Sequence, residues 1–267
     1  MTAGSDTEVR AIGDLLGTGA VGTLYGIGAG AGDPELITVK GLRILRQVPI
    51  VAFPAGLRGN PGVAEQIIAE WLLPHHKKMP LSFPYVQDEG ELTQAWEIAA
   101  DRVWEELRQG KDIAFVSEGD VSFYSTFTYL AQTLQERHPE AIVQTIPGIC
   151  SPMAAAAALG IPLTVRAQKL IILPALYSVT ELETAIASAD VVVLMKVSSV
   201  YSQVWSVLKQ HGLLSRSYVI ERATLPNQVI YADLSDRPSL KLPYFSLMIV
   251  QVREASQNPI ELFGSLS

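Results

Sequence analysis

Three short polar segments in this chain follow apolar runs and carry side chains suited to binding or catalysis. The turn "SEGD" places Glu118 and Asp120 directly after the run "DIAFV", and Lys196 follows the run "VVVLM". Ligands of open α/β sheets collect at the carboxyl ends of the strands. Carboxylates at such ends accept hydrogen bonds from ribose hydroxyls or ammonium groups, and a lysine attracts an acidic ligand. The third segment is "ERAT" at residues 221–224, and the three together predict a small-molecule site at strand ends.

Several common catalytic motifs are absent from the sequence. Neither C-x-x-C nor H-E-x-x-H occurs, so the spacing gives no reason to expect a bound metal. The absence of G-x-S-x-G disfavours an ordinary serine hydrolase. Cys150, the single cysteine, lies in "PGICSP" with no histidine nearby in the sequence, which disfavours a cysteine hydrolase. The five alanines at residues 154–158 favour close packing of the backbone.

The stretch "YGIGAGAGDPELIT" (residues 25–38) has the glycine content of a dinucleotide-binding loop. That fingerprint also requires an acidic residue about 20 positions later, at the end of the second strand, for the ribose hydroxyl. The corresponding strand end carries Phe53 and Pro54 instead. Asp33 lies at the predicted helix entrance, where its carboxylate would repel a pyrophosphate. The glycines are therefore interpreted as a turn that permits close approach of a ligand, and an NAD(P)-linked oxidoreductase remains a disfavoured alternative.

Composition and charge narrow the class of protein. Of the 267 residues, 48% are hydrophobic and 18% are charged, which is typical of a globular chain with a substantial core. The formal net charge of −7 offers no basic field for nucleic acid. The uncharged stretch at residues 141–165 is interrupted by prolines and glycine, so we expect no membrane association. One cysteine cannot form an internal disulfide, which favours a cytoplasmic protein.

Alternation of strands and helices predicts an α/β protein with two domains. In the first half, the helix expected over 34–47 has Asp33 as its N-cap and Pro34 at its first position. In the second half, the last three strands are close in sequence, which favours antiparallel pairing and a mixed sheet. The ranges are strands 23–29, 48–55, 112–120, 141–147, 169–175, 191–197, 217–222, 228–234 and 244–252, and helices 34–47, 61–73, 92–109, 125–136, 180–189 and 200–211.

The expected boundaries give three parts. Residues 1–21 form a loosely ordered extension, 22–146 an N-terminal α/β domain with a mainly parallel sheet, and 147–267 a C-terminal α/β domain with a mixed sheet. The histidines and lysines of "HHKK" (residues 75–78) are expected in a solvated loop.

In their order along the chain, these motifs resemble the tetrapyrrole methylases, the class III S-adenosylmethionine-dependent methyltransferases. The resemblance runs from about residue 23 to 252 through "LYGIGAGAGDPELIT", "EGD", "FYSTF", "IPGICSPMAAAAALGIPL", "VVLMKV", "ERAT" and "PYFSLMIV". It is greatest for the branch that methylates precorrin-2 or cobalt-factor II at C20 in cobalamin biosynthesis. Three departures are Ala31 and Val121, where the family usually has proline, and "MKVSS", where MKVG is more usual.

The resemblance implies a kidney-shaped pair of α/β domains with the cofactor in the cleft between them, and a homodimer. It also implies S-adenosyl-L-methionine as the methyl donor and a tetrapyrrole as the substrate, with the glycine loop beside the substrate. Ser125 and Thr126 are also expected to cap a helix. The implied cofactor contacts are Ala31, Glu118, Gly119, Asp120, Phe123, Ser125, Thr126, Cys150, Ser151, Met195, Ala223 and Thr224.

Three residues are the candidates for catalysis. Asp120 is expected to orient the macrocycle nitrogens or to accept a proton, Lys196 to bind a substrate carboxylate, and Tyr244 to donate a hydrogen bond near the reacting edge. An acidic protein binds a carboxylate-rich tetrapyrrole only through local cations. Besides Lys196, these are Arg43, Arg46, Arg58 and "HHKK".

Other functions remain open at this point. One is a methylase of the same superfamily that acts at another tetrapyrrole position, on diphthine or on ribosomal RNA, although the net charge disfavours RNA. A second is the oxidoreductase considered above, and a third is a non-catalytic ligand carrier.

Overall fold

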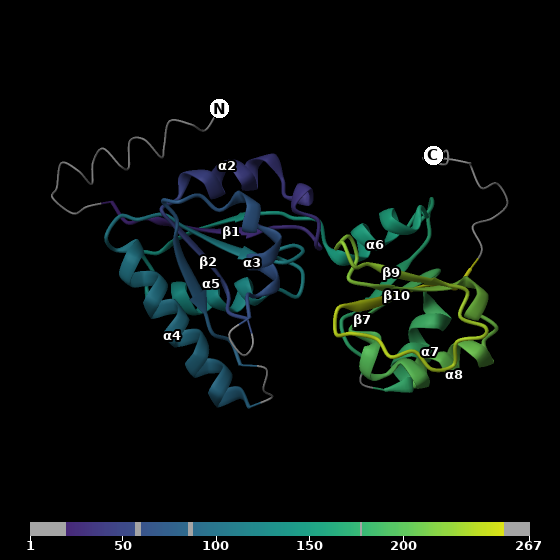
Figure 1. Cartoon of the computed structure of the whole chain (residues 1–267). Coiled ribbons are helices and arrows are strands. Elements are labelled where there is room, and N and C mark those ends of the chain that lie inside the picture. The colour runs from purple at the N-terminus through teal and green to yellow at the C-terminus, as the bar shows by residue number, and fades with distance from the viewer. Residues whose placement is uncertain (1–19, 57–59, 85–87, 177, 254–267) are drawn as a thin grey trace. The chain divides into compact units, whose positions relative to one another are not determined.

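The structure is a computed structural model of the whole chain, and it describes residues 20–56, 60–84, 88–176 and 178–253 (Figure 1). The chain divides into two compact units, Met1–Ile149 and Cys150–Ser267. The expected N-terminal extension lies almost entirely outside the described residues. Among the residues described, no helix is both long and apolar enough to span a bilayer.

The first unit contains a five-stranded parallel sheet in the order β3-β2-β4-β1-β5. Its inner strands read as continuous apolar runs because both faces of the sheet are covered. The strands are β1 (Thr23–Gly28), β2 (Ile50–Pro54), β3 (Lys77–Leu81), β4 (Ile113–Ser117) and β5 (Ile142–Ile146). The helices are α2 (Val39–Gln47), α3 (Val63–Ile67), α4 (Glu89–Leu107) and α5 (Thr126–Arg137), with 3₁₀ turns at Pro34–Leu36 and Ala69–Trp71.

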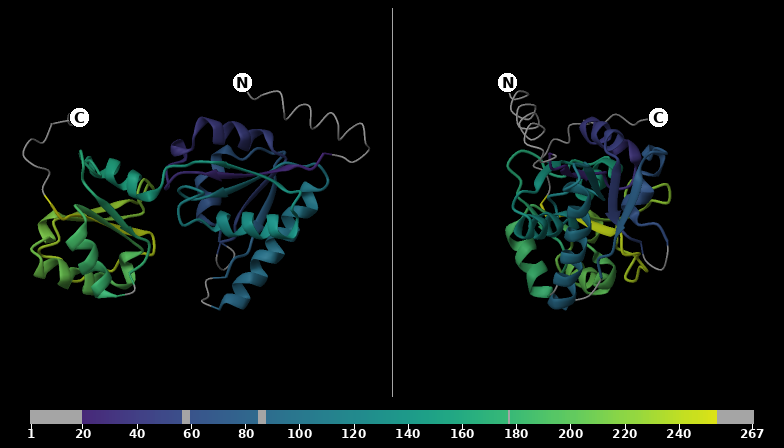
Figure 2. Two further views of the ribbon diagram at one scale, coloured as in Figure 1. Left: turned by 180° about the vertical axis from the view of Figure 1, so that it is seen from behind. Right: turned by 90° about the vertical axis from the view of Figure 1, so that its left-hand side faces the viewer.

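Helices cover this sheet on opposite faces. Ile113 and Phe115 of β4 pack with α4 and α5, whereas the alternate residues Ala114 and Val116 pack with α2 and α3. Views from the front and from behind show α2 across the sheet from α4 and α5 (Figures 1 and 2). Because β1 and β4 are neighbours whose following helices lie on opposite faces, their carboxyl ends form the topological switch point of the sheet, where ligands bind in such folds.

The second unit contains a five-stranded mixed sheet in the order β6-β7-β10-β8-β9, in which only β6 and β7 are parallel. The strands are β6 (Leu170–Leu173), β7 (Val191–Met195), β8 (Ser217–Glu221), β9 (Val229–Ala232) and β10 (Ser246–Gln251). The helices are α6 (Ser151–Leu159), α7 (Val179–Ser188) and α8 (Tyr201–Gln210), with 3₁₀ turns at Val197–Ser199 and Leu214–Arg216. The predicted mixed sheet and antiparallel pairing are confirmed.

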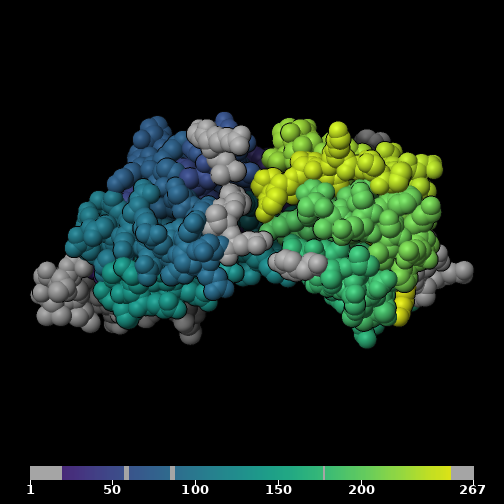
Figure 3. All heavy atoms as spheres, turned by 90° about the horizontal axis from the view of Figure 1, so that it is seen from below, coloured from purple at the N-terminus to yellow at the C-terminus, as the bar shows by residue number. Residues whose placement is uncertain are grey.

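Different helices cover the two faces of this second sheet. The alanines of α6 pack on one face together with Met195 and Ala223. The apolar sides of α7 and α8 pack on the other face. Figure 3 shows the region of α7 and α8 in green on the surface of this unit. The small side chains of α6 allow the helix to approach the sheet closely, as the alanine run predicts.

The prediction of one helix over 34–47 is wrong in one respect, because the structure has two helical segments there. Asp33 does cap a helical turn, accepting a hydrogen bond from the Glu35 N–H at 2.8 Å, but that turn is 3₁₀ and ends at Leu36. Ile37 is extended and buried in the core, and Thr38 begins α2 by capping the Gly41 N–H at 3.1 Å. Burial of the Ile37 side chain and the new cap at Thr38 together stabilise the break more than the backbone hydrogen bonds of a continuous helix would stabilise the unbroken form.

Two further expectations need correction. The helix expected over 61–73 is divided into α3 and a 3₁₀ turn, which Ile68 joins with non-helical backbone angles. The "HHKK" segment is not entirely a loop, because Lys77 and Lys78 begin the edge strand β3. Charged residues on an edge strand discourage pairing with another chain, so lysine at this position is compatible with a strand.

The carboxyl ends of three strands of the first unit are packed against one another through glycine. A Cβ atom added to Gly148, after β5, would lie 2.2 Å from the Gly119 carbonyl oxygen and 2.7 Å from Gly28. A Cβ atom on Gly28 would lie 2.6 Å from the Gly148 nitrogen. These contacts involve backbone atoms, which cannot rotate away as a side chain can.

We expect the substitution Gly148→Ala to lower the free energy of unfolding of the first unit by about 2–3 kcal/mol, because the added methyl group overpacks the contact. Urea unfolding followed by tryptophan fluorescence measures this change. Gly90→Ala is the control in the same unit, because a Cβ there meets only a side-chain oxygen of Asp88, and helix propensity favours alanine. Equal stability of the two variants would contradict the packing argument.

Candidate functional site

The turns that follow β1 and β4 lie side by side. The Gly119 N–H donates to the Gly30 carbonyl at 2.7 Å, and the Gly30 N–H donates to the Gly119 carbonyl at 3.2 Å. The Ala29 N–H donates to the Ser117 carbonyl at 2.9 Å. Gly30 and Gly119 both have positive φ, at 86° and 69°, which glycine adopts without strain. The glycine loop and the "EGD" turn therefore meet at the switch point.

This contact changes the interpretation of the glycine run. At Gly28, the backbone atoms of Gly119 and Gly148 lie so close that no side chain fits. At Gly30, both the positive φ and a contact with Leu36 disfavour any other residue. The glycines thus allow the protein's own loops to pack together, and Ala31, between Gly30 and Gly32, is half-buried.

Asp120 links two of the loops with its carboxylate. One oxygen, Oδ2, accepts from the Gly148 N–H at 2.7 Å, while Oδ1 accepts from the N–H and the hydroxyl of Ser122. Partial burial raises the pKa of this carboxyl group, but the three hydrogen bonds outweigh that effect, so the net pKa lies below its usual value. Asp120 is therefore ionised near neutral pH and is a weak base.

The other candidate residues of this unit differ in exposure. Glu118 is exposed, and Phe123 is half-buried with its ring 4.7 Å from that of Tyr124. Ser125 is buried: it is the N-cap of α5, accepting from the Phe127 N–H at 3.2 Å, and it shares a hydrogen bond with Ser117. The predicted cap is confirmed for Ser125, whereas Thr126 is the first residue of the helix.

In the second unit, the predicted residues gather where β7 and β8 end and β10 begins. Met195 pairs with Leu247, and Glu221 pairs with Ser246. Lys196 follows β7, and its Nζ lies 5.7 Å from the centre of the Tyr244 ring, a cation–π distance. The structure thus brings together the two candidate catalytic residues of this unit. Tyr244 is 49% exposed, so its ring also faces solvent.

The backbone of these strand ends adopts an uncommon conformation. Lys196, Arg222 and Thr224 have positive φ values of 52°, 49° and 65°. Such positions cost on the order of 1–3 kcal/mol each and persist only where the surroundings enforce them. Non-glycine residues of this kind concentrate at functional sites, which supports the assignment of this edge.

Three partly buried hydrogen bonds hold the "ERAT" turn in place. Glu221 is 5% exposed and accepts hydrogen bonds from the Tyr231 hydroxyl at 3.0 Å and from the Arg222 guanidinium at 2.8 Å. The side chain of Gln228 accepts from the Thr224 N–H at 2.7 Å. Sequence analysis missed Tyr231 and Gln228, because nothing in their spacing shows that they face this turn.

Cys150 and Ser151 lie at the start of α6. Cys150 is the N-cap residue, its side chain makes no capping hydrogen bond, and its Sγ lies 3.7 Å from Sδ of Met153. Ser151 is half-buried. Over the described ranges, no three histidine, cysteine, aspartate or glutamate side chains are grouped so as to bind a metal ion.

Most of the other cationic candidates have partners elsewhere. Lys77 pairs with Glu106, and Lys78 pairs with Glu65 at 3.1 Å, both at the amino end of the sheet's edge strand. Arg46 lies over the ring of Trp71 at 5.4 Å, and Arg43 is exposed on α2. Arg58 lies outside the described residues. Of the cationic candidates within the described ranges, Lys196 is therefore the one that lies beside predicted site residues.

Comparison with known proteins identifies the family. The family model of the Tetrapyrrole (Corrin/Porphyrin) Methylases matches residues 23–237. The cobalt-precorrin-2 C(20)-methyltransferase of Salmonella typhimurium is 33% identical over 233 residues, which cover 86% of this chain and 96% of that enzyme.

Two further matches extend the comparison. The cobalamin biosynthesis protein CobIJ of Mycobacterium bovis is 34% identical over 86% of this chain, but this chain spans only 46% of that protein's length. The solved uroporphyrin-III C-methyltransferase of Thermus thermophilus, in complex with S-adenosylhomocysteine, shares the fold with a TM-score of 0.59. It is 22% identical, and the match covers 86% of this chain and 97% of that chain. The match of the family model, together with the Salmonella relative, shows that this chain belongs to the tetrapyrrole (corrin/porphyrin) methylases.

Proposed function

We propose that this protein transfers a methyl group from S-adenosyl-L-methionine to C20 of precorrin-2 or its cobalt form, in cobalamin biosynthesis. The observation that carries the proposal is the match to the Salmonella enzyme over 96% of its length. The meeting of the β1 and β4 turns at the switch point supports a small-molecule site in the first unit.

The proposal assigns cofactor contacts to residues of both units. In the first unit, the exposed carboxylate of Glu118 suits a ribose or an ammonium group, and Gly119 leaves the backbone accessible. In the second unit, Met195 and Ala223 belong to one apolar cluster, which suits an apolar ring. The other proposed contacts are Ala31, Asp120, Phe123, Ser125, Thr126, Cys150, Ser151 and Thr224.

When bound, the cofactor supplies a methyl group on a sulfonium, which is already activated for transfer to carbon. With the cofactor bound, its methyl group would pass from sulfur to C20, S-adenosylhomocysteine would be the leaving group, and the C20 proton would pass to water. The protein's main task is therefore alignment, which supplies roughly 7–11 kcal/mol in well-oriented reactions. Asp120, with its lowered pKa, fits the orienting role better than that of a proton acceptor.

Lys196 and Tyr244 are proposed to act on the substrate. The Lys196 ammonium is exposed and suits a carboxylate of the tetrapyrrole, and the exposed Tyr244 hydroxyl suits a hydrogen bond near the reacting carbon. We further propose that the protein is a cytoplasmic homodimer. Sedimentation equilibrium measures its mass directly, and a monomer at micromolar concentration would contradict that assembly.

Incubation with ¹³C-methyl-labelled S-adenosylmethionine and precorrin-2, with and without cobalt, tests the reaction. We expect one label per macrocycle at C20, located by NMR. Label at another carbon would instead support a methylase that acts at a different position of the tetrapyrrole. Tight binding of NADH without binding of S-adenosylhomocysteine would support the oxidoreductase.

We expect Lys196→Ala to raise KM for the tetrapyrrole about 10- to 100-fold, because a charge-assisted hydrogen bond contributes about 1.5–3 kcal/mol. Steady-state kinetics at saturating cofactor measures the change. Lys209→Ala is a matched control, because Lys209 lies over the Trp205 ring at 5.2 Å but belongs to α8, outside the proposed site. Equal KM values for the two variants would remove Lys196 from the substrate site.

We expect Asp120→Asn to destabilise the first unit at pH 7, because the charge-assisted bonds to Gly148 and Ser122 weaken. The folded pKa of Asp120 is lowered, so its stabilising effect is present above the unfolded value of about 3.9 and is lost as pH falls below it. The difference in unfolding free energy between wild type and variant should therefore narrow from pH 6 to pH 3.

Asp233→Asn is the control for that experiment. Asp233 accepts from the N–H and the hydroxyl of Ser235 in the same way, but it makes no bond to a distant loop in the described structure. Its substitution should therefore destabilise the protein less at pH 7 than Asp120→Asn does. If Asp120→Asn were as stable as wild type at pH 7, Asp120 would not link these loops.

A further inference from the structure

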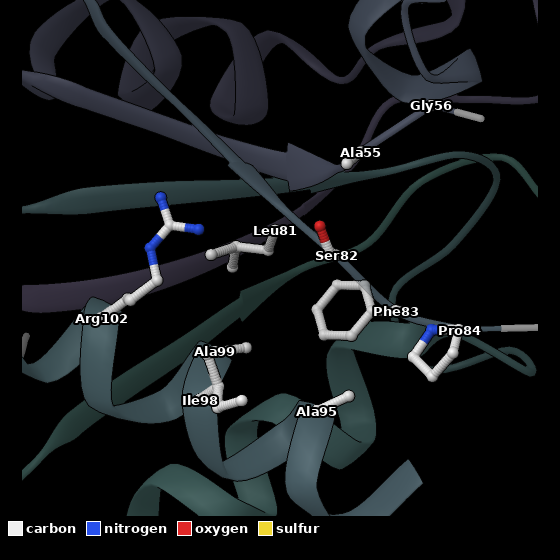
Figure 4. A pocket seen from close by; sticks show the side chains of 10 residues that line it. All are labelled: Ala55, Gly56, Leu81, Ser82, Phe83, Pro84, Ala95, Ile98, Ala99 and Arg102. Atoms are coloured by element: carbon white, nitrogen blue, oxygen red, sulfur yellow. The ribbon is translucent and has the colours of Figure 1, made fainter. Parts of the chain in front are cut away.

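A pocket lies in the first unit, where β2 and β3 end and α4 passes beneath them. It has a volume of ≈ 410 Å³. Figure 4 shows Phe83 at its centre, Ala95, Ile98 and Ala99 from α4 on one side, and Arg102 at one end. The complete lining is Ala55, Gly56, Leu81, Ser82, Phe83, Pro84, Ala95, Ile98, Ala99 and Arg102.

Arg102 is the charged residue of this lining. Its Nη1 donates to the Pro80 carbonyl at 3.0 Å, which holds the guanidinium at the pocket. Among the residues that the structure describes, no carboxylate forms an ion pair with it, unlike Arg108, Arg137 and Arg222. A guanidinium has five N–H donors and stays charged, so most of its capacity is available to an anion.

The rest of the lining selects for a partly apolar ligand. Phe83 is fixed by stacking on Trp96, with 4.5 Å between ring centroids, so its ring is a rigid wall. Ser82 adds one exposed hydroxyl. The volume is near the lower end of the about 300–1,000 Å³ that is typical of small-molecule pockets. It suits one ring with a short arm rather than a whole macrocycle.

We propose that this pocket binds one carboxylate-bearing pyrrole arm of the tetrapyrrole substrate, with Arg102 pairing to the carboxylate and Phe83 contacting the ring. This inference rests on the proposed function. The pocket and the β1 and β4 turns lie at the same carboxyl edge of one sheet, and β2 is the direct neighbour of β4. Adjacent strands are about 4.8 Å apart, so the pocket and the switch point are within the span of a four-ring macrocycle.

A direct binding experiment tests the pocket without any turnover. The probe is 3-(pyrrol-3-yl)propionate, and its amide is the uncharged ligand control. Binding is measured by NMR with fluorotryptophan-labelled protein, with the Trp96 resonance assigned by Trp96→Phe. We expect the acid to shift that resonance and to bind more tightly than the amide.

Two variants assign the effect to the guanidinium. Arg102→Gln should weaken binding of the acid about 10- to 100-fold and leave the amide unaffected, and Arg102→Lys should fall between it and wild type. Arg108→Gln is the matched control, because Arg108 lies at the end of the same helix and pairs with Glu105 at 2.6 Å. Equal affinities of wild type and Arg102→Gln for the acid would overturn the proposal.

Kinetics separates this proposal from the proposed function. If precorrin-2 is methylated, Arg102→Gln should raise its KM with little change in kcat, and an unchanged KM would overturn the substrate role of the pocket. If wild type binds the pyrrole acid through Arg102 but methylates no form of precorrin-2, the proposed function fails while the carboxylate pocket stands.

Discussion

The close approach of three strand ends in the first unit is the constraint on which the rest of its site depends. Gly28, Gly119 and Gly148 bring the backbones after β1, β4 and β5 into contact, and the Asp120 carboxylate bonds across to Gly148. A side chain at Gly28 or Gly148 would separate these loops. Glu118 and Phe123 belong to the segment that follows β4. Their orientation therefore depends on these three glycines and on the Asp120 carboxylate.

The second unit positions its candidate residues by a different device. There, Lys196, Arg222 and Thr224 adopt the positive φ values that glycine adopts more easily. Polar contacts around the turn stabilise this strained backbone. Glu221 would be costly to bury alone, but its bonds to Tyr231 and Arg222 satisfy the carboxylate. These contacts constrain the turn, which suits the alignment of two reactants in the proposed reaction.

Individual side-chain charges explain how an acidic protein would bind the acidic substrate that we propose. The net charge of −7 gives no general attraction for carboxylates, so individual cations must supply it. Several arginine and lysine side chains form ion pairs with the protein's own carboxylates, as Arg137 does with Asp101. Lys196 lies beside an aromatic ring and Arg102 beside a carbonyl, and both keep their charge available to a ligand.

The sequence by itself determined the fold class, the family and the positions of most elements. The long apolar periodicity of α4, the Asp33 cap and the strand-end turns are local features, and local chemistry predicts them. Only the tertiary structure decided that Ile37 breaks a helix, that Lys77 and Lys78 lie on a strand, and that Asp120 bonds to Gly148. That Arg102 has no carboxylate partner in the part of the chain that the structure describes was also decided only by the tertiary structure. Each of these depends on which distant groups come into contact, and sequence spacing carries no such information.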